Sequence, residues 1–524
     1  MSLALLAPCL VSVVYDAVVV GAGYAGMAAA HKLTAAGLDV VVLEAADRVG
    51  GRIRNYLPSD GSYDVIGDSV VEVGGTFVSP SHTALIQFAS QMGVDVYNVS
   101  AGGGVTSRRR PRVPDTRLGE PVSTWPWWYW GVDTEADMAE SVLHTESGTL
   151  TFHSPEELKS KLSGMAVFDE LEAAGGTMSS TIAGLSCEAA DEHWADFDGI
   201  TFEGWIRKHV SHEEGRSVLR AMCRGMIAQE PSQVSFLSTA KSLKGCWSAG
   251  DDDQYRLRGG SQAPLLEAAK RLGITKLRLS SPVRAVRQAK KHATKAHGRD
   301  DDLADAARTY EVATDGATYE AKSVILTGTP AALTAIHIPL LGANDAQLLQ
   351  RMPMGESAKL FFFYSAPWWR AAGKSANVMS TTGYTACMDH SAYDADSGSA
   401  ALMCWLEGAT NLGFFGRENR TAATEEVLAF LQASLDNDPR VHEYTSTVCL
   451  DWPEDVYARG AYTGFFTPGV QSQPTFWDAF RRTEKAPGLF VAGADYYAGV
   501  GNGYMEGAVR SGEAAAKTII GRVG

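Results

Sequence analysis

A glycine-rich segment near the start of the chain has the spacing needed to hold a dinucleotide. Gly21, Gly23 and Gly26 follow the apolar residues 17–20. In this pattern the first glycine permits a tight turn, the second lets the backbone approach a pyrophosphate, and the third allows a helix to pack closely on a strand. Glycines in this spacing also occur for purely structural reasons, so the flanking elements decide between the two interpretations.

Lys359 is a basic residue in an apolar stretch. Residues 358–364 read Ala-Lys-Leu-Phe-Phe-Phe-Tyr, and the alternation of side chains along a strand places Lys359 on the same face as Phe361 and Phe363. A buried ammonium is costly unless it has a partner or a lowered pKa. The alternative is a lysine near a strand end whose ammonium reaches water.

The elements around the glycine segment favour a cofactor site. The apolar residues 17–20 predict a buried parallel strand, and a helical pattern then continues to Leu33. A second apolar run, residues 40–43, ends at Glu44, whose carboxylate is placed to accept hydrogen bonds from a ribose. Together, strand, turn, helix, strand and acid predict an α/β fold with a Rossmann-like dinucleotide site.

Size and charge limit the class of protein. A chain of 524 residues exceeds the usual size of one core, so we expect two domains. The 46 basic and 61 acidic residues give a net charge of −15, which argues against a nucleic-acid partner. No run of about 18 apolar residues is present, so we expect no membrane span. No cysteine or histidine spacing predicts a metal site.

Four strings of residues resemble the flavin amine oxidase family. They are Arg-Val-Gly-Gly-Arg at 48–52, Val-Gly-Gly-Thr-Phe-Val at 73–78, Tyr-Ala-Arg-Gly-Ala-Tyr-Thr-Gly-Phe-Phe-Thr-Pro-Gly at 457–469 and Gly-Tyr-Met-Glu-Gly-Ala-Val-Arg-Ser-Gly at 503–512. The resemblance covers most of the chain and is closest to the fungal-type monoamine oxidases and to relatives that act on fumonisins. It implies FAD as the cofactor and a Rossmann-like FAD-binding domain beside a discontinuous α+β substrate-binding domain.

The same resemblance implies where FAD is held. Ala461 stands where animal monoamine oxidases carry the cysteine that is bonded to their flavin, so it implies noncovalent FAD here. Asp495 replaces the glutamate that is commoner in the family. Arg52 is expected to neutralise a phosphate or to contact the flavin edge. The implied cofactor contacts are Gly21, Gly23, Ala25, Gly26, Glu44, Ala45, Gly51, Arg52, Gly74, Gly75, Thr76, Val283, Trp452, Ala461, Gly493, Asp495, Gly503 and Met505.

Three residues are implied to be catalytic. The family's lysine near the flavin matches Lys359, which would make a water-bridged contact to flavin N5. Two family tyrosines flank the amine in front of the flavin, and they match Tyr462 and Tyr504; taken singly, each tyrosine is more often a core residue. Phe77 and Gln254 match residues of the family's substrate pocket.

The order of the strings predicts two domains that are each discontinuous. Residues 15–96, 259–333 and 455–524 would form the FAD-binding domain, and residues 97–258 and 334–454 the substrate-binding domain. Residues between 288 and 308 carry lysines, histidines and an aspartate run, which predict a solvated hairpin insertion.

The implied reaction is the oxidation of an amine. Hydride equivalents pass to FAD, the imine hydrolyses to a carbonyl compound and ammonia, and oxygen reoxidises the flavin to give hydrogen peroxide. An amino-acid oxidase, which needs a cation for the substrate carboxylate, and a polyamine oxidase are alternatives within the reaction class. A noncatalytic flavoprotein is the alternative outside it, and the presence of Lys359 with both tyrosines argues against it.

Three further features concern location and assembly. The seven cysteines are scattered, and they predict reduced core residues in an intracellular, cytoplasmic protein. The apolar residues 3–14, with no preceding lysine or arginine, leave secretion as the alternative. The aromatic cluster Trp-Pro-Trp-Trp-Tyr-Trp at 125–130 is compatible with an entrance, a homodimer contact or packing beneath the substrate domain.

Overall fold

A computed structural model describes most of the chain. The described residues are 13–99, 105–107, 140–145, 147–162, 167–187, 193–246, 255–289, 309–381, 386–393, 399–416 and 420–523. The aromatic cluster at 125–130, three consecutive aspartates at 251–253, Gln254 and most of the insertion between 288 and 308 lie outside them.

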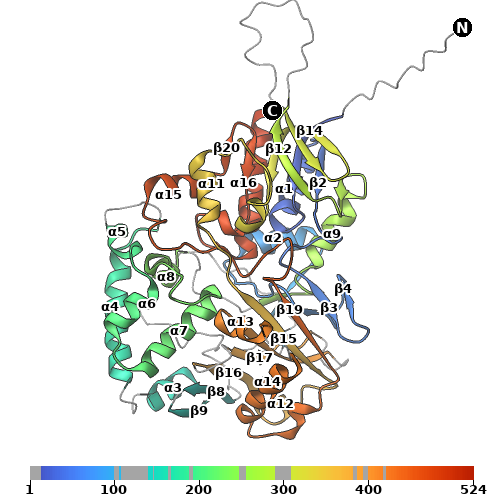
Figure 1. The fold of residues 1–524 in the computed structure, drawn as a ribbon. Helices are drawn as coiled ribbons and strands as arrows, with labels where there is room; N and C mark the ends of the chain where they lie inside the picture. Colours follow the sequence, from blue (N-terminus) through green and yellow to red (C-terminus); the bar gives the residue numbers. More distant parts are fainter. Residues whose placement is uncertain are drawn as a thin grey trace, which may run out of the picture.

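An eight-stranded sheet carries the glycine-rich turn. Its order is β11-β2-β1-β14-β13-β12, and β21, which also pairs with β20, pairs with β14. The strands at its centre are parallel, as the apolar runs predict. Helix α1 (Tyr24–Ala35) packs beside the C-terminal helix α16 (Met505–Val523), because the alanines of α1 let the two backbones approach (Figure 1). The strands are β1 (Val14–Val20), β2 (Val40–Leu43), β11 (Leu277–Arg278), β12 (Val283–Gln288), β13 (Tyr310–Thr314), β14 (Thr318–Leu326), β20 (Glu484–Ala486) and β21 (Leu489–Val491).

A seven-stranded sheet carries Lys359. Its order is β19-β15-β18-β17-β16-β8-β9. One face packs on α12 (Trp368–Ala371), α13 (Ala409–Phe415) and α14 (Arg420–Ser434) (Figure 1). The apolar side chains of β15 and β18 alternate between the two faces of the sheet. The strands are β8 (Glu140–Thr145), β9 (Gly148–Phe152), β15 (Ser357–Tyr364), β16 (Lys374–Ser380), β17 (Ala386–Asp389), β18 (Ala400–Glu407) and β19 (Ser446–Asp451).

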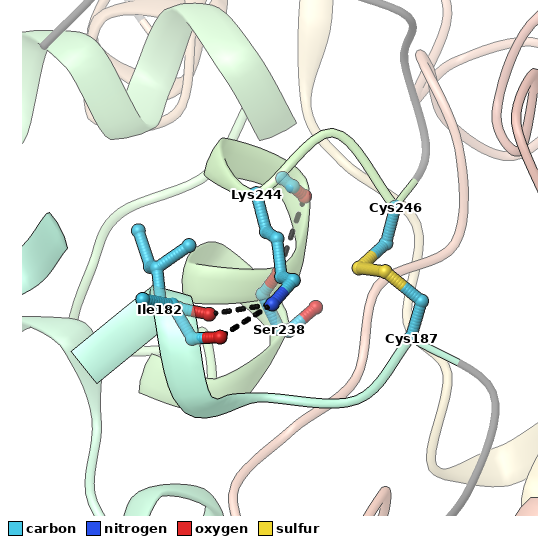
Figure 2. Close-up of a disulfide and its surroundings, with 7 residues drawn as sticks. Ile182, Cys187, Ser238, Lys244 and Cys246 are labelled. Carbon is cyan, nitrogen blue, oxygen red and sulfur yellow. Dashed lines mark hydrogen bonds between the residues drawn. A yellow bond between two sulfur atoms is a disulfide. The ribbon is translucent and has the colours of Figure 1, made fainter. Parts of the chain in front are cut away.

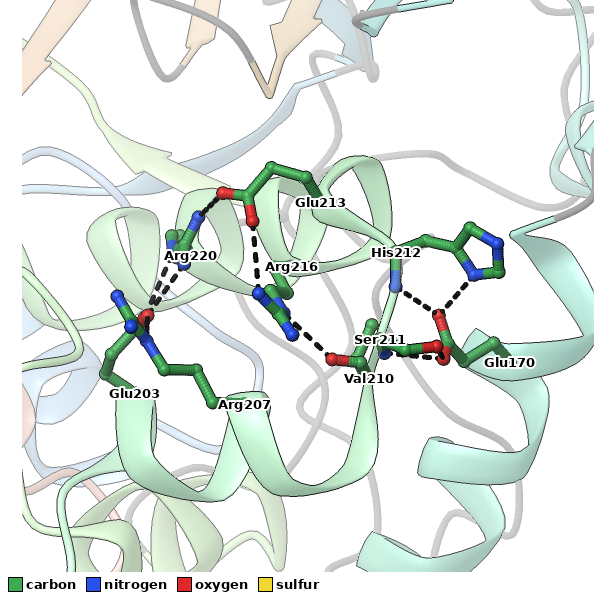
Figure 3. A network of polar contacts seen from close by, with 9 residues as sticks. All are labelled: Glu170, Glu203, Arg207, Val210, Ser211, His212, Glu213, Arg216 and Arg220. Carbon is green, nitrogen blue, oxygen red and sulfur yellow. Dashed lines mark hydrogen bonds and ion pairs between the residues drawn. The ribbon is translucent and has the colours of Figure 1, made fainter.

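A group of helices lies beside this sheet. It contains α3 (Pro155–Leu162), α4 (Phe168–Gly184), α5 (His193–Asp198), α6 (Phe202–His209), α7 (Glu213–Ile227) and α8 (Phe236–Leu243) (Figure 1). Figure 3 shows the polar network that links α4, α6 and α7: Glu203 accepts from Arg207 and Arg220, and Glu170 accepts from Ser211 and His212. Exposed ion pairs stabilise a fold by only about 0–1 kcal/mol each, so the apolar contacts below them hold these helices together.

Two small sheets join these parts. The first contains β3 (Asn55–Leu57), β4 (Ser62–Tyr63) and β5 (Val71–Glu72), and the second contains β6 (Val96–Val99), β7 (Val105–Ser107) and β10 (Tyr255–Leu257). The remaining helices are α2 (Thr83–Gln91), α9 (Ala263–Leu272), α10 (Pro330–Leu333), α11 (Ala343–Gln350) and α15 (Pro474–Arg481), with short 3-10 turns at Pro439–His442 and Ala494–Tyr496.

The predicted fold class is confirmed by these two large sheets. The first draws its strands from residues 14–43, 277–326 and 484–491, and the second from residues 140–152 and 357–451. The domain boundaries themselves stay a prediction. Strands β12 and β13 pair antiparallel on either side of the predicted insertion.

The prediction of reduced cysteines is wrong for four of them. Cys187, which follows α4, is bonded to Cys246, which follows α8, as Figure 2 shows, and Cys387 on β17 is bonded to Cys404, its direct partner on β18. Cys223 and Cys449 are free thiols. Disulfides persist mainly in oxidising compartments, so this pairing does not support the cytoplasmic expectation.

Across the described part of the chain, no helix combines the length and the apolar character needed to cross a bilayer.

Candidate functional site

The glycine turn after β1 has the geometry that a pyrophosphate site requires. Gly21 has a φ of +107°, which favours glycine, and a Cβ at Gly26 would lie 1.9 Å from the carbonyl oxygen of Gly21. Gly23 is the N-cap residue directly before α1, and no side chain caps this helix end. The N–H groups at the start of α1, including that of Ala25, are therefore available to an anion.

Glu44 lies against this turn. Its Oε2 accepts a hydrogen bond from the Ala22 N–H at 2.6 Å, and its Oε1 accepts one from the Ala46 N–H at 2.8 Å. Burial raises the pKa of the Glu44 carboxyl, although both backbone hydrogen bonds act in the opposite direction. Each oxygen keeps a second lone pair, so the carboxylate and the neighbouring Ala45 are compatible with the expected ribose contact.

The two glycine pairs predicted at 50–51 and 74–75 lie side by side. Gly51 has a φ of +59°, and a Cβ at Gly74 would lie 2.4 Å from the carbonyl oxygen of Arg52. A Cβ at Gly75 would lie 2.8 Å from the Ile53 side chain. The two strings therefore need glycine in order to pass one another, which fits a cradle of backbone around a flat cofactor.

Arg52, which the sequence predicts beside a phosphate or the flavin edge, forms an ion pair within the protein. Its guanidinium donates two hydrogen bonds to the buried Asp495 carboxylate, at 2.9 and 2.6 Å, and one to the carbonyl oxygen of Tyr462 at 2.6 Å. Asp495 also accepts from the Thr463 hydroxyl and the Gly464 N–H. Burial opposes ionisation of this carboxyl, but Arg52 outweighs it, so the pKa of Asp495 is lowered. Asp495 and Arg52 thus fix the backbone that carries Tyr462.

Lys359 is buried, with 6% of its surface exposed. Its ammonium donates to the Gly74 carbonyl at 2.6 Å and to the Thr76 hydroxyl at 2.9 Å, and lies 3.5 Å from the Glu72 carbonyl. The interpretation of Lys359 as a strand-end lysine reaching water is therefore wrong. The ammonium therefore contacts residues 74–76, which the resemblance assigns to cofactor binding. Its water-bridged contact to flavin N5 stays a prediction.

A buried charged cluster, which no sequence pattern indicates, lies beside Lys359. The Glu72 carboxylate forms an ion pair with Arg256, and His390 lies 3.7 Å from the same carboxylate. Burial alone would raise the pKa of Glu72, but Arg256 and His390 outweigh it and lower this pKa to about 2. Burial, helped by Arg256, lowers the pKa of His390 to about 3. The ring of Phe77 packs against His390 at a centroid distance of 5.8 Å.

This cluster predicts a pH dependence of stability. The pKa of Glu72 lies near 2 in the folded protein, against 4.5 for the ordinary carboxyl. Its stabilising contribution is therefore fully present above pH 4.5 and is lost as the pH falls toward 2. Glu72→Gln is expected to lower the free energy of unfolding at neutral pH by about 1.5–3 kcal/mol, because a charged hydrogen bond to Arg256 is lost.

Urea unfolding of both proteins at several pH values checks this expectation. The difference between parent and variant should shrink as the pH falls below 4.5, where Glu72 loses its advantage in the folded state. A constant difference down to the acid limit would contradict the assigned charge state.

The strings that carry the two tyrosines are adjacent. A Cβ at Gly503 would lie 3.2 Å from the Thr463 side chain, so the residue before Tyr504 touches the residue after Tyr462. Ala461 packs with the buried Trp452 and donates its N–H to the Gly355 carbonyl at 2.9 Å. The structure thus brings Ala461, Tyr462, Trp452 and Gly503 together, as the resemblance implies.

The start of α16 is tied to α2. Glu506 accepts from the Ala84 and Leu85 N–H groups at 3.1 and 2.7 Å, which satisfies the uncapped end of α2. The ring of His82 lies 5.2 Å from that of Tyr504. Glu506 and His82, which the sequence analysis did not assign, therefore hold the loop that presents Tyr504.

The other predicted cofactor residues lie on the eight-stranded sheet and on α16. Gly493, after β21, donates its N–H to Ser511 of α16, and Met505 is the first residue of α16. Val283 begins β12 in the same sheet as β1 and is buried. Gln254 lies outside the described residues. In the described part of the chain no group of side chains has the composition of a metal site.

Comparisons with known proteins agree with this arrangement. A family model described as flavin containing amine oxidoreductase matches residues 24–520. A probable flavin-containing monoamine oxidase A of Dictyostelium discoideum is 26% identical over 97% of this chain and 98% of its own length. Putrescine oxidase of Kocuria rosea is 27% identical over 97% of this chain and 95% of its own.

Two further comparisons concern function and fold. An L-amino acid dehydrogenase of Synechocystis is 27% identical over 97% of this chain and 95% of its own length. The solved cyclohexylamine oxidase of Brevibacterium oxydans superposes with a TM-score of 0.78 at 20% identity, covering 98% of this chain and 100% of that one. At that identity the likeness shows the fold.

Proposed function

Since this chain belongs to the flavin-containing amine oxidoreductase family, we propose that it oxidises an amine with noncovalent FAD and molecular oxygen. The amine loses two electrons and two hydrogens to become an imine, and these reduce oxygen to hydrogen peroxide. Water then hydrolyses the imine to a carbonyl compound and ammonia.

The observation that carries this proposal is the position of Lys359. Its buried ammonium lies on the carbonyl of Gly74 and the hydroxyl of Thr76, within the string that resembles a cofactor-binding segment. Burying an ammonium is costly, so a catalytic use of this charge beside the expected cofactor segment is favoured over a purely structural one.

Each part of the site has a task in this reaction. When bound, FAD supplies the hydride acceptor and the electron path to oxygen. The turn from Gly21 to Gly26 and the start of α1 hold the pyrophosphate, and Glu44 holds a ribose. Tyr462 and Tyr504 restrict the orientation of the amine, which is catalysis by positioning. Lys359 stabilises negative charge that develops on oxygen.

Among the described residues, the charged pairs beside Lys359 and Tyr462 favour an amine with a single charged group. An amino acid needs a cation for its carboxylate, but the guanidiniums of Arg52 and Arg256 are both paired with buried carboxylates. A polyamine needs a carboxylate for its second ammonium, but the carboxylates of Asp495 and Glu72 are already paired with Arg52 and Arg256. Because two relatives are named as an L-amino acid dehydrogenase and a putrescine oxidase, the test also includes amino acids and diamines.

Peroxide release from a panel of substrates tests the proposal. The panel should contain monoamines, diamines and L-amino acids, each assayed with the FAD-loaded protein and with the flavin removed. We expect peroxide and ammonia in equal amounts from monoamines. A preference for amino acids would move the protein to the first alternative, and no peroxide from any compound would contradict catalysis.

Noncovalent attachment gives a separate prediction. Denaturing the flavin-loaded protein with acid or heat should release FAD into the supernatant, because Ala461 has no thiol to form a thioether. Absorbance of the supernatant and of the redissolved precipitate measures the partition. Flavin that stays with the precipitated polypeptide would contradict this prediction.

A further inference from the structure

His390 joins the two ends of the segment 72–76, which carries the second glycine pair. Its Nε2 lies 3.4 Å from the hydroxyl oxygen of Thr76 and 3.7 Å from the carboxylate of Glu72. The same segment supplies the carbonyl and the hydroxyl that accept hydrogen bonds from the Lys359 ammonium. One imidazole therefore touches both ends of the backbone that holds this ammonium.

The ring of His390 is fixed by its surroundings and is 1% exposed. Its backbone N–H donates to the Ala401 carbonyl of β18 at 2.9 Å, and Arg256 donates to the carbonyl of the residue that follows it at 2.7 Å. The rings of Phe77 and Phe361 meet the imidazole edge to face, at centroid distances of 5.8 and 5.4 Å. The position of Nε2 is thus set by contacts other than those to Lys359.

The proton of the neutral imidazole belongs on Nε2. A carboxylate only accepts hydrogen bonds, so the ring nitrogen that faces Glu72 acts as the donor. Within the described part of the chain Nδ1 of His390 has no hydrogen-bond partner, and a buried N–H without an acceptor is rare. Burial, helped by Arg256, lowers the pKa of His390 to about 3, so the ring is uncharged at neutral pH.

This tautomer accounts for each hydrogen bond of the Thr76 hydroxyl, which has one proton and two lone pairs. The proton is donated to the Gly74 carbonyl at 3.2 Å. One lone pair faces Nε2 of His390, and the other accepts from the Lys359 ammonium at 2.9 Å. The hydroxyl is therefore left with one orientation, in which it is an acceptor for Lys359.

We propose that His390 is a positioning residue for Lys359, an inference that rests on the role of this lysine in the proposed function. The imidazole holds the Thr76 hydroxyl and the segment 72–76 in the arrangement that keeps the ammonium at a fixed point. A charge stabilises a transition state most when it is held in place before the reaction begins. Because the imidazole is neutral, it does this without placing a second cation beside the ammonium.

Reoxidation of chemically reduced flavin by oxygen tests this inference without any amine. FAD-loaded protein is reduced with one equivalent of dithionite and mixed with oxygenated buffer. His390→Leu should slow reoxidation about tenfold, because a shift of about 1 Å in a positioned group costs up to a hundredfold in rate. The parental rate in His390→Leu would overturn the inference.

Two amide variants form a matched pair. The side-chain N–H₂ of a glutamine reaches about as far as Nε2 of a histidine, whereas that of an asparagine reaches only as far as Nδ1. His390→Gln should therefore restore most of the parental rate, and His390→Asn should be as slow as His390→Leu. This comparison also decides the question if the leucine variant does not fold. Equal rates in the two amide variants would overturn the inference.

Combining His390→Leu with Lys359→Met separates positioning from general damage to the fold. If His390 acts through Lys359, removing the imidazole from a protein that already lacks the ammonium should slow reoxidation no further. FAD content and melting temperature are measured for each variant. A slowing of the same size in both backgrounds would overturn the inference, because His390 would then act independently of Lys359.

The amine panel separates this inference from the proposed function. If no amine is oxidised, but reoxidation follows the expected pattern in these variants, the positioning role of His390 stands and the proposed amine reaction fails. If amines are oxidised and His390→Leu reoxidises at the parental rate, the amine reaction stands and the positioning role fails.

Discussion

Replacing either tyrosine with leucine is expected to lower the rate of flavin reduction by the amine about a hundredfold, since losing a positioned near-attack geometry has an effect of this size. Tyr462 and Tyr504 come from adjacent segments that touch through Thr463 and Gly503. Neither ring exchanges a proton in the proposed reaction. Anaerobic rapid mixing with the preferred amine measures the rate directly.

Phenylalanine at the same positions is the control. Tyr462→Phe and Tyr504→Phe keep the ring wall and remove only the hydroxyl, so their rates should stay closer to the parent. All four variants should keep FAD and a melting temperature near that of the parent. Leucine variants that reduce flavin at the parental rate would return these tyrosines to a core role.

Replacing Lys359 with methionine is expected to slow the reoxidation of reduced flavin by oxygen about a hundredfold. Removing one preorganised charged group from a water-excluded site costs 10² to 10³ in rate in comparable cases. The proposed cofactor contacts at Gly21 and Glu44 lie on other elements, so FAD binding should persist. Mixing anaerobically reduced protein with oxygenated buffer gives the rate.

Lys359→Arg is the matched control, since it keeps the positive charge. Its reoxidation rate should fall less than that of Lys359→Met, although a guanidinium does not reproduce the contacts to Gly74 and Thr76. An unchanged reoxidation rate in Lys359→Met, with FAD still bound, would show that this lysine is structural.

The geometry of the glycine turn and its neighbours could be predicted because its signals are local. The glycine turn, helix α1 and Glu44 lie within about one βαβ unit, and each residue type is fixed by a backbone need such as the positive φ of Gly21. The burial of Lys359 could be predicted from strand alternation in the same way, although its acceptors could not.

The residues missed by sequence reasoning depend on distant contacts. Glu72 and Arg256 are 184 positions apart, and neither stands in a pattern that predicts an ion pair. Arg52 and Asp495 are 443 positions apart, so the engagement of Arg52 by a carboxylate could not be foreseen. The bond between Cys387 and Cys404 follows from the register of β17 on β18, which the sequence alone does not determine.

The most direct test of the central claim is anaerobic titration of the FAD-loaded protein with a monoamine. The account predicts that one equivalent of amine bleaches the oxidised flavin, and that admitting oxygen restores its absorbance and yields one equivalent each of hydrogen peroxide and carbonyl product. Flavin that stays oxidised with every amine of the panel, at concentrations where the amine is shown to bind, would contradict it.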